Sequence, residues 1–172
     1  MLRCNSDHKF KIMQIADTQE IPAVSPDTLS LINNALDREK PDLVIFTGDQ
    51  IKGYSKKFKK DPAIIESTID ILVEPIAKRN IPFMVTYGNH DAQCGVDNRG
   101  QYKFYAKYDN FISGDLRNAD DVGTADIQIY SSTEDKPVFE LYIIDSHGKA
   151  KDGAGYAPVD KKQIEWYISR RE

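Results

Sequence analysis

Three short apolar runs alternate with helical patterns through the first half of the chain. The runs cover Phe10–Ala16, Leu43–Phe46 and Phe83–Thr86, and their mainly apolar character is typical of buried strands. Between them, apolar residues recur at the spacing of a helix, at Leu29, Ile32, Leu36, Ile65, Ile69, Leu72 and Ile76. Strands that alternate with helices predict a parallel sheet with right-handed crossovers, so we expect an α/β fold.

The two expected helices begin at recognisable signals. Ser25-Pro26 supplies a cap and a first helical residue for a helix that runs to about Glu39. Asp61-Pro62 opens the second helix, which follows a polar stretch, Gln50–Lys60, that we expect to be a loop. The first half of the chain is therefore predicted to be a βαβαβ unit.

The second half changes to aromatic and β-rich patterns. A helix-like aromatic stretch, Tyr102–Phe111, precedes two β-rich runs, Asp126–Ser131 and Val138–Asp145. Their short separation predicts an antiparallel hairpin added to the parallel core. After a glycine-containing loop at Lys151–Ala157, Asp160 can cap a last helix.

Composition narrows the class of protein. The 172 residues are 40% hydrophobic and 29% charged, which fits a single globular domain over residues 1–172. A net charge of -4 without a basic stripe argues against binding to duplex nucleic acid. No run approaches 18 apolar residues, and Cys4 and Cys94 form no CxxC pair. We therefore expect a soluble, cytoplasmic protein without membrane contact, and the oligomeric state stays open.

Chemically active side chains follow each of the three predicted parallel strands. Asp17 follows the first strand, Asp49 the second, and Asn89-His90-Asp91 the third. Ligands of open α/β sheets bind outside the carboxyl ends of the strands, and hard divalent cations prefer such oxygen-rich groups. Turn formation explains Gly48 and Gly88, which precede the second and third motifs, but it does not require a carboxylate or imidazole after every strand. A metal-centred site is the better interpretation.

These residues also resemble a known family. The opening motifs of the calcineurin-like metallophosphoesterases are similar to Asp17-Thr18-Gln19, Gly48-Asp49 and Gly88-Asn89-His90-Asp91. Three later stretches resemble the branch related to purple acid phosphatases: Leu141–Ser146, Gly155-Tyr156 and Gln163–Tyr167. The resemblance implies a calcineurin-like sandwich with a parallel βαβαβ core and an antiparallel hairpin. It also implies a metal-dependent phosphoesterase whose substrate is a phosphorylated small molecule or another phosphoester.

The resemblance implies roles for individual residues around two divalent ions, which would be Mn, Fe, Zn or Mg. Asp17 and Gln19 would hold the first ion, Asp49 would bridge both, and Asn89 would hold the second. His90 would contact the scissile phosphate or protonate the leaving oxygen, and Asp91 would orient His90. Two ions about 3.5–4 Å apart lower the pKa of a shared water and stabilise an in-line displacement.

The sequence departs from the family pattern in two places. Gln19 stands where the family usually has His, and its neutral amide oxygen predicts a preference for Mn or Mg over Zn. Family members also carry a metal-binding His and a Gly-His-x-His motif beyond the region that matches Gln163–Tyr167, whereas this sequence stops at Glu172. We therefore expect that the C-terminal part of the domain is missing. An alternative is a catalytically crippled fragment that binds metal weakly and acts as a folding or interaction unit.

Two further features admit a functional and a structural interpretation. His147 follows a predicted strand, so it either faces the candidate site or is a loop histidine. The basic run Lys56–Lys60 either attracts an anionic substrate or is a solvated loop. The sequence favours the structural interpretation in both cases.

Overall fold

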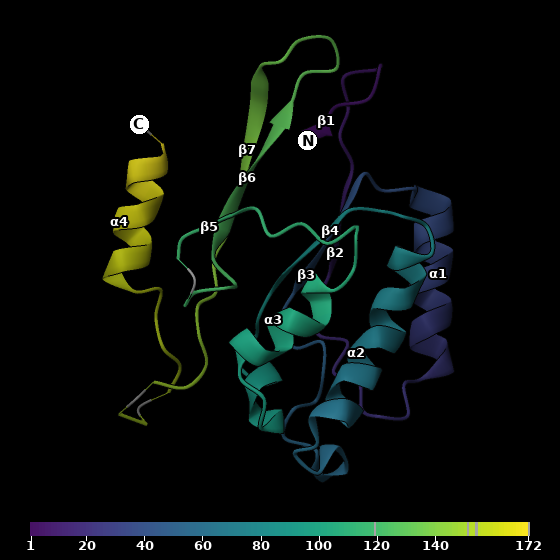
Figure 1. The fold of residues 1–172 in the computed structure, drawn as a ribbon, viewed down its shortest axis with the longest axis vertical. Coiled ribbons are helices and arrows are strands. Elements are labelled where there is room, and N and C mark those ends of the chain that lie inside the picture. The colour runs from purple at the N-terminus through teal and green to yellow at the C-terminus, as the bar shows by residue number, and fades with distance from the viewer. Residues whose placement is uncertain (119, 151, 154, 172) are drawn as a thin grey trace.

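The computed structural model describes residues 1–118, 120–150, 152–153 and 155–171, and it contains two β-sheets (Figure 1). The first sheet is parallel throughout and has the order β2-β3-β4, with β2 at Ile12–Ile15, β3 at Leu43–Thr47 and β4 at Phe83–Thr86. This confirms the predicted parallel core. Two helices form its crossovers, α1 (Pro26–Glu39) and α2 (Pro62–Ala77).

The second sheet is built around β6 (Ala125–Tyr130). It pairs with β7 (Pro137–Ile143) and β5 (Asp115–Leu116) in antiparallel fashion, and with the N-terminal β1 (Leu2–Arg3) in parallel. The β6–β7 pair is the predicted hairpin. The sequence pattern missed β1 and β5, because each has only two residues and so shows no periodicity.

The core lies on both faces of the first sheet. Val44 and Phe46 of β3 pack toward the helices, whereas Leu43 and Ile45 face the second sheet. This follows from the alternation of side chains along a strand. The layers therefore run from the helices through the parallel sheet to the second sheet, with α1, α2 and α3 (Asn98–Ala106) on one side in Figure 1 and α4 (Lys161–Arg170) on the far side.

The expectation that the first apolar run is a buried strand is wrong. Ile12 is 36% exposed and Gln14 is exposed, because β2 is at the edge of the sheet and pairs with β3 alone. An apolar run can also be an edge strand, and the sequence pattern does not distinguish the two positions.

Two other elements differ from their predicted extents. The aromatic helix begins earlier than predicted, at Asn98, because Asp97 caps it by accepting a hydrogen bond from the Gly100 amide at 2.7 Å. It also ends earlier, at Ala106. The polar stretch before α2 contains a short 3-10 helix, η1 (Lys56–Phe58), and a second one, η2 (Asp91–Cys94), follows β4. Across the described ranges, no helix is long and apolar enough to cross a membrane.

Candidate metal centre

The segments that follow the three parallel strands meet at one edge of the sheet. The Asp17 amide donates to the Gly48 carbonyl at 3.0 Å, and the Gln19 amide donates to the Asp49 carbonyl at 2.9 Å. The His90 amide donates to Asp49 Oδ1 at 2.8 Å. Hydrogen bonds thus join the first strand end to the second and the second to the third, and the predicted residues lie together.

Two glycines allow this close approach. A Cβ atom on Gly48 would lie 2.5 Å from the Gly88 nitrogen, and one on Gly88 would lie 2.1 Å from Asp49 Oδ1. Gly48 also has a φ of +104°, which side chains rarely adopt. The glycines that precede Asp49 and Asn89 are therefore required by the packing of the two loops against each other.

Three candidate ligands have a left-handed backbone. The φ angles are 54° at Asp17, 44° at Gln19 and 53° at Asp49. Such a conformation costs a residue with a side chain about 1–2 kcal/mol, and it is enriched at functional sites. It turns the chain sharply as it leaves each strand, so that the next residues stay at the sheet edge.

Asp91 holds the loops together. Its buried carboxylate accepts hydrogen bonds from the amides of Asp49 (2.7 Å), Gly88 (2.8 Å) and Ile51 (3.3 Å). Burial raises the pKa of the Asp91 carboxyl to about 6, although the three amide donors favour its charged form. Asp91 thus contacts the backbone around Asp49 in this structure.

The ring of His90 has two neighbours that the sequence did not indicate. Its Nδ1 lies 3.1 Å from Gln93 Oε1, and its ring centroid lies 4.7 Å from that of Tyr54 in an edge-to-face contact. The Tyr54 hydroxyl in turn donates to Gln19 Oε1 at 3.4 Å. Gln93 could have been anticipated from its position three residues after His90, but Tyr54 lies in a loop without any such signal.

His147 lies on a loop that reaches this edge. A Cβ atom on the neighbouring Gly148 would be 3.7 Å from the Asn89 carbonyl oxygen. The His147 amide donates to Asp145 Oδ1 at 2.7 Å, and its Nε2 lies 3.6 Å from Asp160 Oδ2. The loop is therefore adjacent to Asn89, while the imidazole is directed to Asp160 and α4.

The donor set consists of oxygen atoms. Asp49 is buried, Gln19 and Asn89 are half-buried, and Asp17 is exposed. Among the described residues, no group of three or more His, Cys, Asp or Glu side chains has an arrangement that could hold a metal ion. Binding would therefore depend on the amide oxygens of Gln19 and Asn89 as well as on the two carboxylates, a set that suits hard cations such as Mg²⁺ and Mn²⁺.

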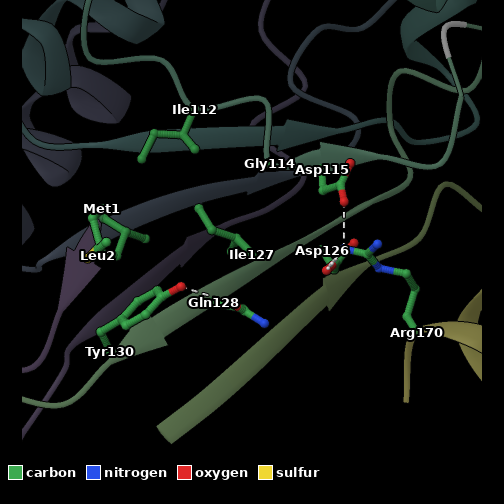
Figure 2. A pocket seen from close by; sticks show the side chains of 10 residues that line it. All are labelled: Met1, Leu2, Ile112, Gly114, Asp115, Asp126, Ile127, Gln128, Tyr130 and Arg170. Carbon is green, nitrogen blue, oxygen red and sulfur yellow. Dashed lines mark hydrogen bonds and ion pairs between the residues drawn. The ribbon is translucent and has the colours of Figure 1, made fainter. Parts of the chain in front are cut away.

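A separate cavity of about 490 Å³ lies along the second sheet and α4 (Figure 2). At one end of it, Arg170 Nη2 contacts Asp115 Oδ2 at 2.5 Å and Asp126 Oδ2 at 2.8 Å. None of the candidate ligands lines this cavity. The chemistry predicted from the strand ends is therefore not located there.

Comparisons with known proteins agree with the sequence motifs. The model of the calcineurin-like phosphoesterase family matches residues 10–169. Phosphatase DCR2 of Saccharomyces cerevisiae is 33% identical over 190 residues, which cover 96% of this chain and 32% of that protein. "Probable inactive purple acid phosphatase 14" of Arabidopsis thaliana is 28% identical over 195 residues, which cover 96% of this chain and 47% of that protein. The chain thus spans less than half the length of these two relatives.

A solved structure supports the fold. The crystal structure of a dimetal phosphatase from Danio rerio has a TM-score of 0.53 and 14% sequence identity, with 92% of this chain and 50% of that chain covered. The predicted α/β class, the family resemblance and the similarity to the branch of purple acid phosphatases are all confirmed. The chain belongs to the calcineurin-like phosphoesterase family.

Proposed function

We propose that this protein hydrolyses phosphate esters with the help of two divalent metal ions. The observation that carries the proposal is the direct hydrogen bonding between the three strand-end segments that bear Asp17, Asp49 and His90. When bound, the two ions would supply an activated water and neutralise charge on the phosphoryl group. Family membership supports this chemistry.

In this proposal the ligands come from all three strand ends. Asp17 and Gln19 would hold one ion, and Asn89 would hold the other. Asp49 lies between these groups, bonded to the Gln19 amide through its carbonyl and to the His90 amide through Oδ1. A carboxylate has two oxygens and about four lone-pair positions, so Asp49 can accept this hydrogen bond and still bridge two cations.

His90 has the role of contacting the phosphoryl group or protonating the leaving oxygen. Its contact with Gln93 Oε1 places an N–H at Nδ1, because an amide oxygen only accepts. Nε2 is then the atom directed to the substrate, and it carries a proton when the ring is charged. Asp91 positions His90 through the backbone, since its carboxylate holds the amides of Gly88 and Asp49 on either side of this loop.

A second candidate function is a weak metal binder that acts as a folding or interaction unit. Two observations favour it. Within the part of the chain that the structure describes, no three acidic, thiol or imidazole groups form a metal-binding set. Three relatives from Arabidopsis thaliana also have the word "inactive" in their names.

The test compares Asp49→Asn with Asp109→Asn, an exposed aspartate outside the strand ends. Hydrolysis of 4-nitrophenyl phosphate is measured with Mn²⁺, Mg²⁺ or Zn²⁺, and metal binding by isothermal titration calorimetry. We expect Asp49→Asn to lower kcat/KM by about 100-fold or more and to weaken Mn²⁺ binding, whereas Asp109→Asn matches the wild type. Because the donors are oxygen atoms, we expect the ratio of Mn²⁺ affinity to Zn²⁺ affinity to be higher than in histidine-rich sites.

The outcomes separate the two candidates. If the wild type binds Mn²⁺ without hydrolysing the ester, the second candidate function is supported. Equal activity and equal metal affinity of Asp49→Asn and Asp109→Asn would refute the bridging role of Asp49.

A further inference from the structure

The basic loop that precedes α2 packs directly against the His90 segment. A Cβ atom on Gly53 would lie 2.0 Å from the His90 carbonyl oxygen and 3.0 Å from the Cys94 nitrogen, so the two backbones are in contact. The Tyr54 ring meets the His90 ring at 4.7 Å between centroids. The loop is therefore in direct contact with His90.

The loop has a defined conformation. Phe58, in its centre, is 1% exposed and belongs to the core under the helices. The Ser55 amide donates to the Lys52 carbonyl at 2.7 Å, and the Asp61 amide donates to the Phe58 carbonyl at 2.9 Å. Because the buried ring and these turns fix the backbone, the Cα atoms of the lysines around Phe58 are held in fixed positions.

The loop and η2 line an open pocket of about 370 Å³. The residues that line it include three lysines of the loop, the tyrosine that contacts His90 and the glutamine that contacts its Nδ1: Lys56, Lys59, Lys60, Tyr54 and Gln93. The pocket thus shares Tyr54 and Gln93 with the surroundings of the imidazole. Lys57 belongs to the same loop but does not line the pocket.

The charge of the pocket is positive and uncompensated. No Asp or Glu is among its lining residues, and within the described ranges Lys56, Lys59 and Lys60 form no ion pair. By contrast, Lys107 at the C-terminal end of α3 forms ion pairs with Glu66 and Asp70 of α2. Three neighbouring ammonium groups repel one another, and an anion that binds among them removes this repulsion.

We propose that this pocket binds a second phosphate group of the substrate, so that the preferred substrates are small molecules with two phosphates. The inference rests on the proposed function, because it places the cleaved ester at His90 and the second phosphate in the adjoining pocket. Lysine ammonium groups bind phosphate as point charges with three donors each, and the exposed side chains can adjust to it. The basic run is then a specificity element rather than a solvated loop.

The test uses glucose 1,6-bisphosphate and glucose 6-phosphate as substrates of the 172-residue chain. The triple variant Lys56→Gln, Lys59→Gln, Lys60→Gln is compared with Lys57→Gln. We expect the triple variant to lose about tenfold in kcat/KM for the bisphosphate, mainly through KM, and less than about threefold for the monophosphate. Lys57→Gln should match the wild type on both. Equal losses on both sugars, or an equal loss in Lys57→Gln, would overturn the proposal.

A binding measurement tests whether the pocket binds phosphate independently of whether the protein hydrolyses phosphate esters. NMR titration with methylenebisphosphonate in the presence of EDTA reports on the pocket without metal ions. We expect shifts of the Tyr54 and Gln93 signals in the wild type and in Lys57→Gln, and none in the triple variant. If the wild type cleaves neither the sugar phosphates nor 4-nitrophenyl phosphate, the proposed function fails, and these shifts still decide whether the pocket binds the anion. If the Tyr54 and Gln93 signals of the wild type do not shift, the proposal that the pocket binds phosphate is overturned.

Discussion

The two sheets of this protein are covered to different extents. In the parallel sheet, β4 and all of β3 except Thr47 are buried, since helices pack on one face and the second sheet on the other. In β7, by contrast, Val138 and Phe139 are 55% and 56% exposed. The difference between the inner strands β3 and β4 and the hairpin strand β7 is typical: inner strands of a parallel sheet are covered on both faces, whereas antiparallel strands tolerate solvent on one.

The comparison explains where the candidate site is located. Four of the six residues predicted from the motifs follow the buried strands β3 and β4, where packing fixes the backbone at the strand ends: Asp49, Asn89, His90 and Asp91. Asp17 and Gln19 follow the exposed edge strand β2. Between the hairpin and α4, the described residues that lie beside this region are those of the loop at His147 and Gly148, where a Cβ atom on Gly148 would contact Asn89. A site that must hold ligands in fixed positions is best supported by the more completely packed region.

The largest expected effect is the loss of a core side chain from the parallel sheet. Phe83 is fully buried and contacts the rings of Phe46, Tyr108 and Phe111. Phe83→Ala should lower the free energy of unfolding by about 3–5 kcal/mol, since it leaves a cavity. Phe139→Ala, on the exposed side of β7, should cost less than about 1 kcal/mol. Urea denaturation measures both, and similar losses would show that the two sheets are equally packed.

A glycine substitution tests the close approach of the strand ends. Gly48 and Gly153 both have positive φ, but of the two only Gly48 would bring an added Cβ atom within 4 Å of another residue that the structure describes. Gly48→Ala should therefore cost about 3 kcal/mol, from strain and overlap together, and Gly153→Ala about 1 kcal/mol from strain alone. Thermal unfolding of the two variants provides the comparison. Equal costs would mean that the contact between the two loops imposes no constraint.

A smaller effect is expected from the loss of the hydrogen bonds that join α4 to the residues that flank β6 and β7. Gln163 is fully buried, and its Nε2 donates to the Asp145 carbonyl at 2.7 Å and to Thr124 Oγ1 at 2.9 Å. Gln163→Ala leaves these acceptors unpaired, so α4 should lose about 2 kcal/mol of protection in hydrogen exchange. The exposed neighbour Lys162→Ala should have no such effect. If the amides of β3 lose as much protection as those of α4, the two regions do not unfold separately.

Much of the parallel core could be predicted from the sequence because its signals are local. Apolar runs gave β3 and β4, and the caps at Ser25 and Asp61 gave the starts of α1 and α2. The exposure of β2 could not be predicted, since the position of a strand within a sheet depends on pairing between distant segments. The extent of the domain over residues 1–172 stays a prediction.

The candidate site shows the same division. Asp17, Asp49 and His90 carry a strand-end signal, and the structure brings them together. Tyr54 and Gln93 were missed because their importance arises from a loop that folds back against His90. The contact of Asp91 with three backbone amides was also not predictable, because it depends on how the loops pack.

The pairing of β1 with β6 has a consequence for the order in which the protein forms during synthesis. Arg3 Nη1 donates to the Ser131 carbonyl, which lies 128 residues later in the chain. The three parallel strands are complete by Thr86, so the ribosome has delivered that sheet long before β6 emerges. Until β6 is synthesised, β1 has no strand to pair with. Because β1 has only two residues, its unpaired edge is too short to pair with a strand of another chain.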